Sequence, residues 1–272
     1  MCELNCHFVS RFLTKPWELR NRQLWCYDFE RRQIRKRPSK SLFAEAGRNS
    51  PEIEKRLNHF IERPIANAIT TLVPSGAIDN VEIAGWPLFR AINLLFLVQH
   101  NRVAEKDSHR SGLSQTLLMD EAQLDQLVLA CRETDMIAGL RGNPQAPLCY
   151  PSQGFFGIPI RRPSGSYATV YAIPLTENFV LARVPRDLRI DDIVQTITLG
   201  TGGLFTNCSV GLRSPRVVIH PSVIQAHGAP TAAQMMEDAR KLVREQFLLC
   251  GEMNRLDREI TEIWNWGRSA TR

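Results

Sequence analysis

A run of basic side chains near the amino-terminus is the segment best suited to recognise a ligand. Six of the ten residues from 31 to 40 are cationic, namely Arg31, Arg32, Arg35, Lys36, Arg37 and Lys40. On a hairpin or an edge strand such side chains can follow a phosphate backbone, and each neutralised phosphate releases counterions. Trp17, Trp25 and Tyr27 lie close by in the sequence and could stack on bases. We therefore expect a surface that binds nucleic acid or another polyanion.

The charge balance of the whole chain bears on the same segment. The net charge of the 272 residues is +6; residues 1–63 contain 14 Lys and Arg against 8 Asp and Glu, whereas the remainder holds 20 of each sign. Because the excess of positive charge is confined to residues 1–63, we expect a local positive field rather than a uniformly basic surface. The structural alternative is a solvated edge strand whose charges discourage pairing with other sheets.

Other residue patterns give no sign of a cofactor or a metal. Residues 200–203 (Gly-Thr-Gly-Gly) lack the lysine of a phosphate-binding loop and follow a helical pattern, so they predict a helix end and a turn. The seven cysteines show no C-x-x-C spacing, and His220 and His227 have no partner at the spacing of metal ligands. We expect neither a cofactor nor a bound metal.

Several short segments resemble a known family. They are Asn-Cys-His-Phe-Val-Ser-Arg-Phe-Leu at 5–13, Trp-Cys-Tyr-Asp at 25–28, the Ile-Glu pairs at 53–54 and 61–62, Ile-Pro-Leu-Thr at 173–176, and residues 207–219. Together they resemble a bacterial family of domains of unknown function, number 4238, over residues 5–220. Ser10 stands where that family usually has proline, and Pro-Ser-Gln-Gly at 151–154 replaces its Ser-Asp-Asn-Pro. The resemblance implies a shared fold and no particular activity.

The same resemblance groups five polar residues, namely His7, Arg11, Glu62, Gln99 and Arg102. Such a set is chemically sufficient for acid–base work on a phosphate or acyl group: His7 would move the proton, Glu62 would orient it, and the arginines would hold developing negative charge. A hydrolase or nuclease is therefore an alternative function. The structural alternative is a buried polar network in which Glu62 pairs with an arginine.

Composition and patterning place the chain among globular proteins, with 43% apolar and 23% charged residues. The longest apolar run, Leu94–Val98, is too short to span a bilayer, and no secretion signal is evident. The cysteines are scattered and odd in number, so we expect them to be reduced. These features predict a cytoplasmic protein without a membrane partner, and leave its oligomeric state open.

The elements that would position these residues follow from local signals. Strands are expected at 7–14, 23–29, 155–160, 167–173, 179–184 and 216–220, with a basic hairpin or edge strand over 31–40. Ser50 and Pro51 predict a helix start, and Pro64 should kink or divide that helix. Further helices are expected at 87–101, 120–140 and 232–266, with a polar loop at 105–115.

This order of strands, helices, strands and a long helix favours an α+β fold with an antiparallel sheet, a helical middle section and a long C-terminal helix. We expect one domain over residues 1–272, with a possible subdivision near residue 145. The apolar stripe of the last helix leaves a third function open, a non-catalytic regulator that recruits a partner; packing on the protein's own sheet is the structural alternative.

Overall fold

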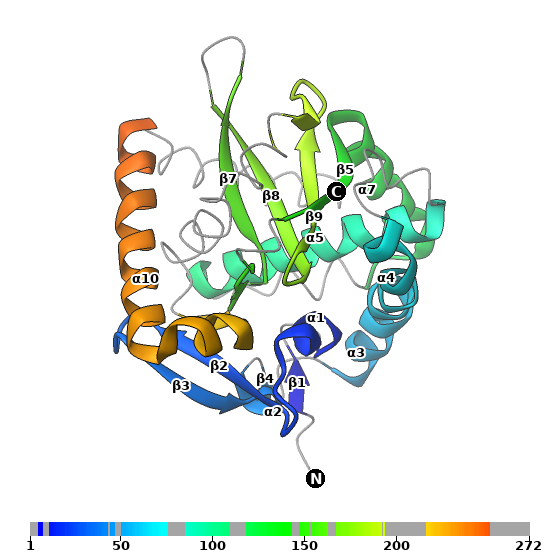
Figure 1. Cartoon of the computed structure of the whole chain (residues 1–272). Coiled ribbons are helices and arrows are strands. Elements are labelled where there is room, and N and C mark those ends of the chain that lie inside the picture. The colour runs from blue at the N-terminus through cyan, green and yellow to red at the C-terminus, as the bar shows by residue number, and fades with distance from the viewer. Residues whose placement is uncertain are drawn as a thin grey trace.

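The computed structural model describes residues 5–7, 11–42, 44–46, 50–75, 85–108, 118–142, 147–152, 154–162, 167–191, 193 and 216–250. Its fold is α+β with antiparallel sheets, as the sequence predicts. The strands form a two-stranded sheet of β1 (Asn5–His7) and β4 (Ala44–Ala46) and two four-stranded sheets. In Figure 1 one of the four-stranded sheets lies at the centre of the molecule with helices around it, whereas strands of the other lie toward the bottom of the view.

The first four-stranded sheet contains the basic run. Strands β2 (Gln23–Asp28) and β3 (Gln33–Pro38) form a hairpin, β10 (Arg216–Ile219) pairs with the other side of β2, and β6 (Tyr150–Pro151) follows. All these pairs are antiparallel. Among the described strands β3 lies at the edge, so the expected basic hairpin is confirmed. Pro38 ends β3, where its missing N–H removes least from the ladder.

The second four-stranded sheet has the order β5 (Asp135–Arg141), β9 (Phe179–Pro185), β8 (Tyr167–Thr176) and β7 (Phe156–Arg161). Three of these strands are those expected from the sequence. The remaining strand, β5, corrects a prediction. The sequence predicts a helix as far as residue 140, but helix α7 (Glu121–Thr134) ends before β5 begins. Ile137 and Leu140 fit either period, and pairing along the whole of β9 favours the strand.

Two helices precede the middle of the chain. Helix α3 (Pro51–Leu57) starts as predicted, with the Ser50 hydroxyl accepting a hydrogen bond from the Ile53 N–H at 3.3 Å. The chain then makes a π-helical turn over Asn58–Glu62 and continues as α4 (Arg63–Ser75). The wider π-turn immediately precedes Pro64, whose ring cannot be accommodated in an unbroken α-helix. The expected division at Pro64 therefore takes this form.

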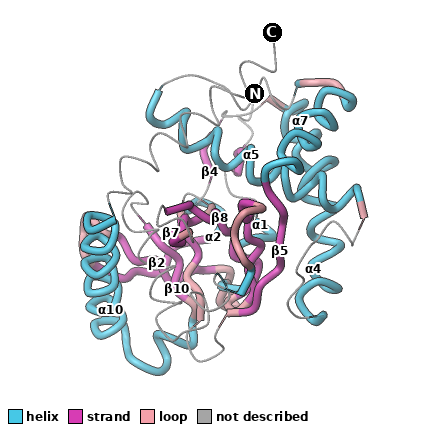
Figure 2. Tube along the Cα trace, turned by 90° about the horizontal axis from the view of Figure 1, so that it is seen from above, coloured by secondary structure: helices cyan, strands magenta, loops and turns pink. Residues whose placement is uncertain are grey.

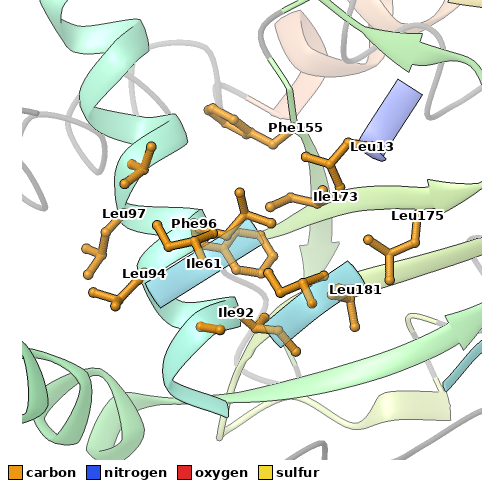
Figure 3. Close-up of a cluster of buried hydrophobic side chains, with 14 of the residues drawn as sticks. Leu13, Ile61, Ile92, Leu94, Phe96, Leu97, Phe155, Ile173, Leu175 and Leu181 are labelled. Carbon is orange, nitrogen blue, oxygen red and sulfur yellow. The ribbon is translucent and has the colours of Figure 1, made fainter. Parts of the chain in front are cut away.

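Helix α5 (Trp86–Ser108) runs across one face of the second sheet (Figure 1). It ends later than predicted and includes the first four residues, 105–108, of the expected polar loop. Its Ile92 and Phe96 are fully buried and belong to one hydrophobic cluster with Ile173 and Leu181 of the sheet, together with Ile61 and Leu13 (Figure 3). Each such buried side chain contributes about 1.5–3 kcal/mol relative to an exposed one.

Helix α10 (Pro221–Cys250) covers one face of the first sheet and bends at Gly228, whose φ of 75° and ψ of 158° are not helical. Figures 1 and 2 show it beside the β2–β3 hairpin. It begins earlier than predicted and packs Met236 against Tyr27 and Val217. At the amino-terminus, α1 (Arg11–Thr14) replaces the second half of the strand expected at 7–14. A short helix α2 (Ser39–Leu42) follows β3.

Candidate anion-binding site

The register of the first sheet determines which basic side chains lie together. Arg35 lies opposite Cys26 and Arg37 opposite Leu24 across the β2–β3 pair, while Arg216 of β10 lies opposite Asp28. Cross-strand partners share a face, and alternate residues of one strand do so too. One face therefore receives arginines from β3 and from β10, with β2 between them.

The turn of the hairpin is fixed by Asp28. Its Oδ1 accepts hydrogen bonds from the backbone N–H groups of Glu30 and Arg31, both at 3.1 Å. Arg32 closes the turn with a φ of 50°, in the left-handed region. This arrangement brings Arg31 to the same end of the sheet as Asp28 and Gln33.

Asp28 also pairs with the guanidinium of Arg216, whose Nε lies 3.1 Å from Asp28 Oδ2. Burial acts to raise the pKa of Asp28, but the hydrogen bonds from the Arg31 backbone and from Arg216, with the charge of Arg216, outweigh it and hold the pKa below its usual value. The carboxylate is thus ionised at neutral pH, and both of its oxygens are engaged.

These side chains line a small hollow that is open to solvent. Its lining consists of Cys26, Asp28, Arg31, Gln33, Arg35, Arg37 and Arg216, and we call it the arginine hollow. Four guanidinium groups meet one carboxylate there, so the lining carries a net positive charge. Among the described residues, no ion pair neutralises Arg31, Arg35 or Arg37. Mutual repulsion of these cations is relieved when an anion enters.

A hydrogen bond and a raised pKa describe the rest of the lining. Arg35 donates from Nε to Gln33 Oε1 at 2.9 Å, which holds both side chains on the exposed face of β3. Burial raises the pKa of the Cys26 thiol to about 12. The thiol is therefore protonated at neutral pH and serves as a neutral part of the lining, not as a nucleophile. The lining of the hollow thus combines four guanidinium groups, one carboxylate, one amide and one neutral thiol.

The structure separates the predicted basic run. Arg31, Arg35 and Arg37 line the hollow, whereas Lys36 lies on the other face, with its Nζ 4.8 Å from the centre of the Trp25 ring. Arg32 is close enough to Tyr27, on that second face, to act on its pKa. Lys40 is exposed on α2, beyond the strand. Strand alternation is the cause, because neighbouring residues of β3 point to opposite faces.

The second face also carries the aromatic residues of β2, Trp25 and Tyr27. Tyr27 is fully buried, and its hydroxyl hydrogen-bonds the Glu237 carboxylate of α10. Arg240 of α10 stacks on the Phe29 ring at 4.9 Å. Trp17 is also fully buried and donates from Nε1 to the Leu148 carbonyl at 2.8 Å. Tyr27 and Trp17 are thus used inside the fold and are not placed to stack on bases beside the hollow.

The residues expected to form an acid–base cluster are placed as follows. Arg11 is about half exposed and pairs with Glu18, with 3.4 Å between Nε and Oε1. Gln99 is buried on α5 beside Gly154, and Glu62 ends the π-helical turn. The side chains of His7 and Arg102 lie outside the described residues. The acid–base cluster therefore stays a prediction.

Sequence analysis missed Arg216 as a member of the site. It is separated from the hairpin by more than 170 residues of chain, and only the pairing of β10 with β2 brings it to Asp28. An arginine at the start of an otherwise apolar short strand was the available signal, and it does not say which strand is the partner. The prediction that Lys36 shares one binding surface with Arg35 and Arg37 was wrong, and the period of a strand was the signal that could have corrected it.

Two wider properties concern the described portion of the chain. Its His, Cys, Asp and Glu side chains form no group of three or more that could hold a metal ion. None of its helices combines the length and apolar character needed to cross a membrane.

In comparisons with known proteins, no family model, no curated protein and no solved structure matches the chain. The resemblance to family 4238 accordingly stays a prediction.

Proposed function

We propose that this protein binds a phosphate-bearing polyanion, in the first place nucleic acid, through the arginine hollow. The observation that carries the proposal is the convergence of Arg31, Arg35, Arg37 and Arg216 around one open space whose lining includes a single carboxylate. Guanidinium groups match phosphate oxygens with paired hydrogen bonds, and they keep their charge at every relevant pH. A phosphate entering the hollow meets several such donors at once.

Binding of this kind has a defined character. The aromatic residues of the hairpin pack into the fold, so the ligand is held through its phosphates and not by stacking of bases. We therefore expect little dependence on base sequence and a strong dependence on salt.

The test is fluorescence anisotropy with labelled mixed-sequence DNA and RNA between about 50 and 200 mM salt, a range over which phosphate contacts are strongly weakened. Replacing Arg35 and Arg37 with glutamine removes two cations from the hollow and leaves the Arg216–Asp28 pair intact. We expect roughly tenfold weaker binding and a shallower salt dependence, because less of the ligand's charge is neutralised by the protein.

The matched control is Arg63→Gln with Arg189→Gln, which removes the same charge from two exposed positions outside the hollow. It should change the affinity by less than about twofold, because a distant exposed charge contributes only through the screened overall field. An equal loss of affinity in the two double variants would show that the net charge of the protein, and not the hollow, determines binding. Unchanged affinity of the Arg35/Arg37 variant would overturn the proposal.

A further inference from the structure

We infer that the arginine hollow takes a phosphate monoester, the terminal phosphate of a nucleic-acid strand, in preference to the phosphodiesters along it. This inference rests on the proposed function and specifies its ligand. It draws on three features of the hollow, namely the directions from which its arginines come, its charge, and the group that closes one end.

The arginines converge on a spot and do not form a track. Arg35 and Arg37 are two residues apart on β3, which places them about 7 Å from each other along the strand. Arg216 reaches the same space from β10, two strand spacings or about 10 Å away across β2. Arg31 comes from the turn at the end. Together they enclose the surface over Cys26 on three sides.

An extended row of phosphodiesters would need a different arrangement. Other cations of this segment do not extend the row: Lys36, between Arg35 and Arg37, lies over Trp25 on the other face, and Lys40 of α2 does not line the hollow. Only Arg35 and Arg37 are therefore in line on this face of the strand. A polyanion lying along β3 would pass Arg31, Arg35 and Arg37 but would leave Arg216, two strands away, outside its path.

The charge of the lining matches a monoester better than a diester. Four arginines and Asp28 give a net charge of +3. A phosphate monoester carries about −1.5 to −2 at neutral pH and presents three terminal oxygens, whereas a diester carries one charge on two free oxygens. Because Gln33 Oε1 accepts from Arg35, the amide nitrogen of Gln33 also remains able to donate to the ligand.

Asp28 limits the hollow to one phosphate. Its carboxylate is held by two backbone N–H groups and by Arg216, so it cannot swing away when an anion approaches. A second phosphate placed toward the turn would face this fixed negative charge at close range. A strand end fits this limit, because its single terminal phosphate enters the hollow while the rest of the strand leaves through the open side.

The experiment compares one short labelled strand in three forms, with a 5′-phosphate, with a 3′-phosphate, and with hydroxyl groups at both ends. We expect one phosphorylated form to bind at least about tenfold tighter than the unphosphorylated strand at pH 7, as charge-assisted paired hydrogen bonds require. If all three bind alike and still need Arg35 and Arg37, the inference is overturned and the proposed function stands. If none binds, both fail.

A change of pH tests the charge of the ligand directly. The second pKa of a phosphate monoester is about 6, so lowering the pH from 7 to 5 should reduce the advantage of the phosphorylated strand by about tenfold. The lining will not titrate in this range: it consists of arginines, a glutamine, a thiol whose pKa is about 12, and Asp28, whose pKa is lowered. An advantage that stays constant down to pH 5 contradicts a dianionic ligand.

Two further experiments test whether guanidinium groups recognise the phosphate and whether that phosphate belongs to a strand or to a free nucleotide. Replacing Arg35 and Arg37 with lysine keeps the charge but loses the planar fork, so the unphosphorylated strand should bind within about twofold of wild type while the phosphate advantage falls severalfold. An unchanged advantage in this variant would contradict paired recognition. A nucleoside monophosphate should compete more weakly than the phosphorylated strand; competition at equal concentrations would overturn the strand-end assignment in favour of a free mononucleotide.

Discussion

Arg183 of β9 donates two hydrogen bonds to one carboxylate oxygen of Asp135 of β5, from Nε at 2.8 Å and from Nη2 at 2.6 Å. Only 10% of the Arg183 side chain and 15% of the Asp135 side chain are exposed. The pair lies between Ile137 and Tyr171, the cross-strand neighbours of Arg183. It therefore fixes a charged group inside the second sheet, at the point where the chain passes from α7 into β5.

Removing one member of this pair should be costly. Replacing Asp135 with alanine leaves the Arg183 guanidinium buried without its carboxylate, and we expect the free energy of unfolding to fall by about 3 kcal/mol. Urea denaturation followed by circular dichroism measures the change. The double variant Asp135→Asn with Arg183→Met removes both charges and should be the more stable of the two. A double variant as unstable as the single one would contradict the role given to the isolated charge.

Gly154 should tolerate no side chain. Its φ is 88°, and a Cβ atom there would lie 2.7 Å from Oε1 and 2.8 Å from Cδ of the buried Gln99. We expect Gly154→Ala to lower the free energy of unfolding by about 2–3 kcal/mol, through backbone strain and overpacking. Gly142→Ala is the control, because its nearest neighbours are 3.6 Å away, and it should cost less than about 1 kcal/mol.

Adding Gln99→Ala to Gly154→Ala separates the two causes. The shorter side chain removes the clash but not the unfavourable backbone angle, so part of the lost stability should return. If the second substitution gives no recovery, the close approach of Gln99 to Gly154 is not the source of the cost.

The stability contributed by Asp28 should depend on pH with a defined sign. Its pKa is lower in the folded protein than its usual value of 3.8, so the ionised form is favoured by folding. The contribution is complete above the unfolded pKa and is lost as the pH falls through the folded one. We therefore expect the difference in unfolding free energy between wild type and Asp28→Asn to be largest at pH 5–7 and to shrink below about pH 4. A difference that grows on acidification would contradict the assignment.

Arg32 should be replaceable without loss of ligand binding. It has a φ of 50° at the end of the hairpin turn and does not line the arginine hollow. Asparagine adopts this conformation more readily, so Arg32→Asn should leave the unfolding free energy the same or raise it by up to about 1 kcal/mol. Anisotropy titration should give an affinity within about twofold of wild type. A loss equal to that of Arg35→Gln would place the whole basic run, and not the hollow, in contact with the ligand.

The contrast between Arg32 and Arg35 shows how far the sequence determines the site. The hairpin, its edge position and the start of α3 at Ser50 follow from local signals, and all are observed. The alternation of β3 already implies that Lys36 faces away from Arg35. Local signals do not show which strand pairs with the edge of β2 opposite β3. They therefore do not show that Arg216 of β10 belongs to the site. That choice is made by packing among distant segments.

The errors in the secondary structure have a similar origin. Residues 135–140 carry apolar side chains at spacings that suit a helix, but the pairing of β5 with β9 and the Asp135–Arg183 contact favour a strand. Arg11–Thr14 has the composition of a strand and forms a helical turn, with Leu13 packed into the core. In both segments a short run fits two periods, and long-range packing decides between them.

The position of β10 between β2 and β6 has a consequence for biosynthesis. During translation the hairpin emerges early, but β10, together with the fourth arginine of the hollow, leaves the ribosome only some 180 residues after the end of the hairpin, from 38 to 216. Until then β2 has an unpaired edge, and a nascent or truncated chain lacks Arg216 beside Asp28. The full set of four arginines therefore comes together only after β10 has been synthesised and has paired with β2.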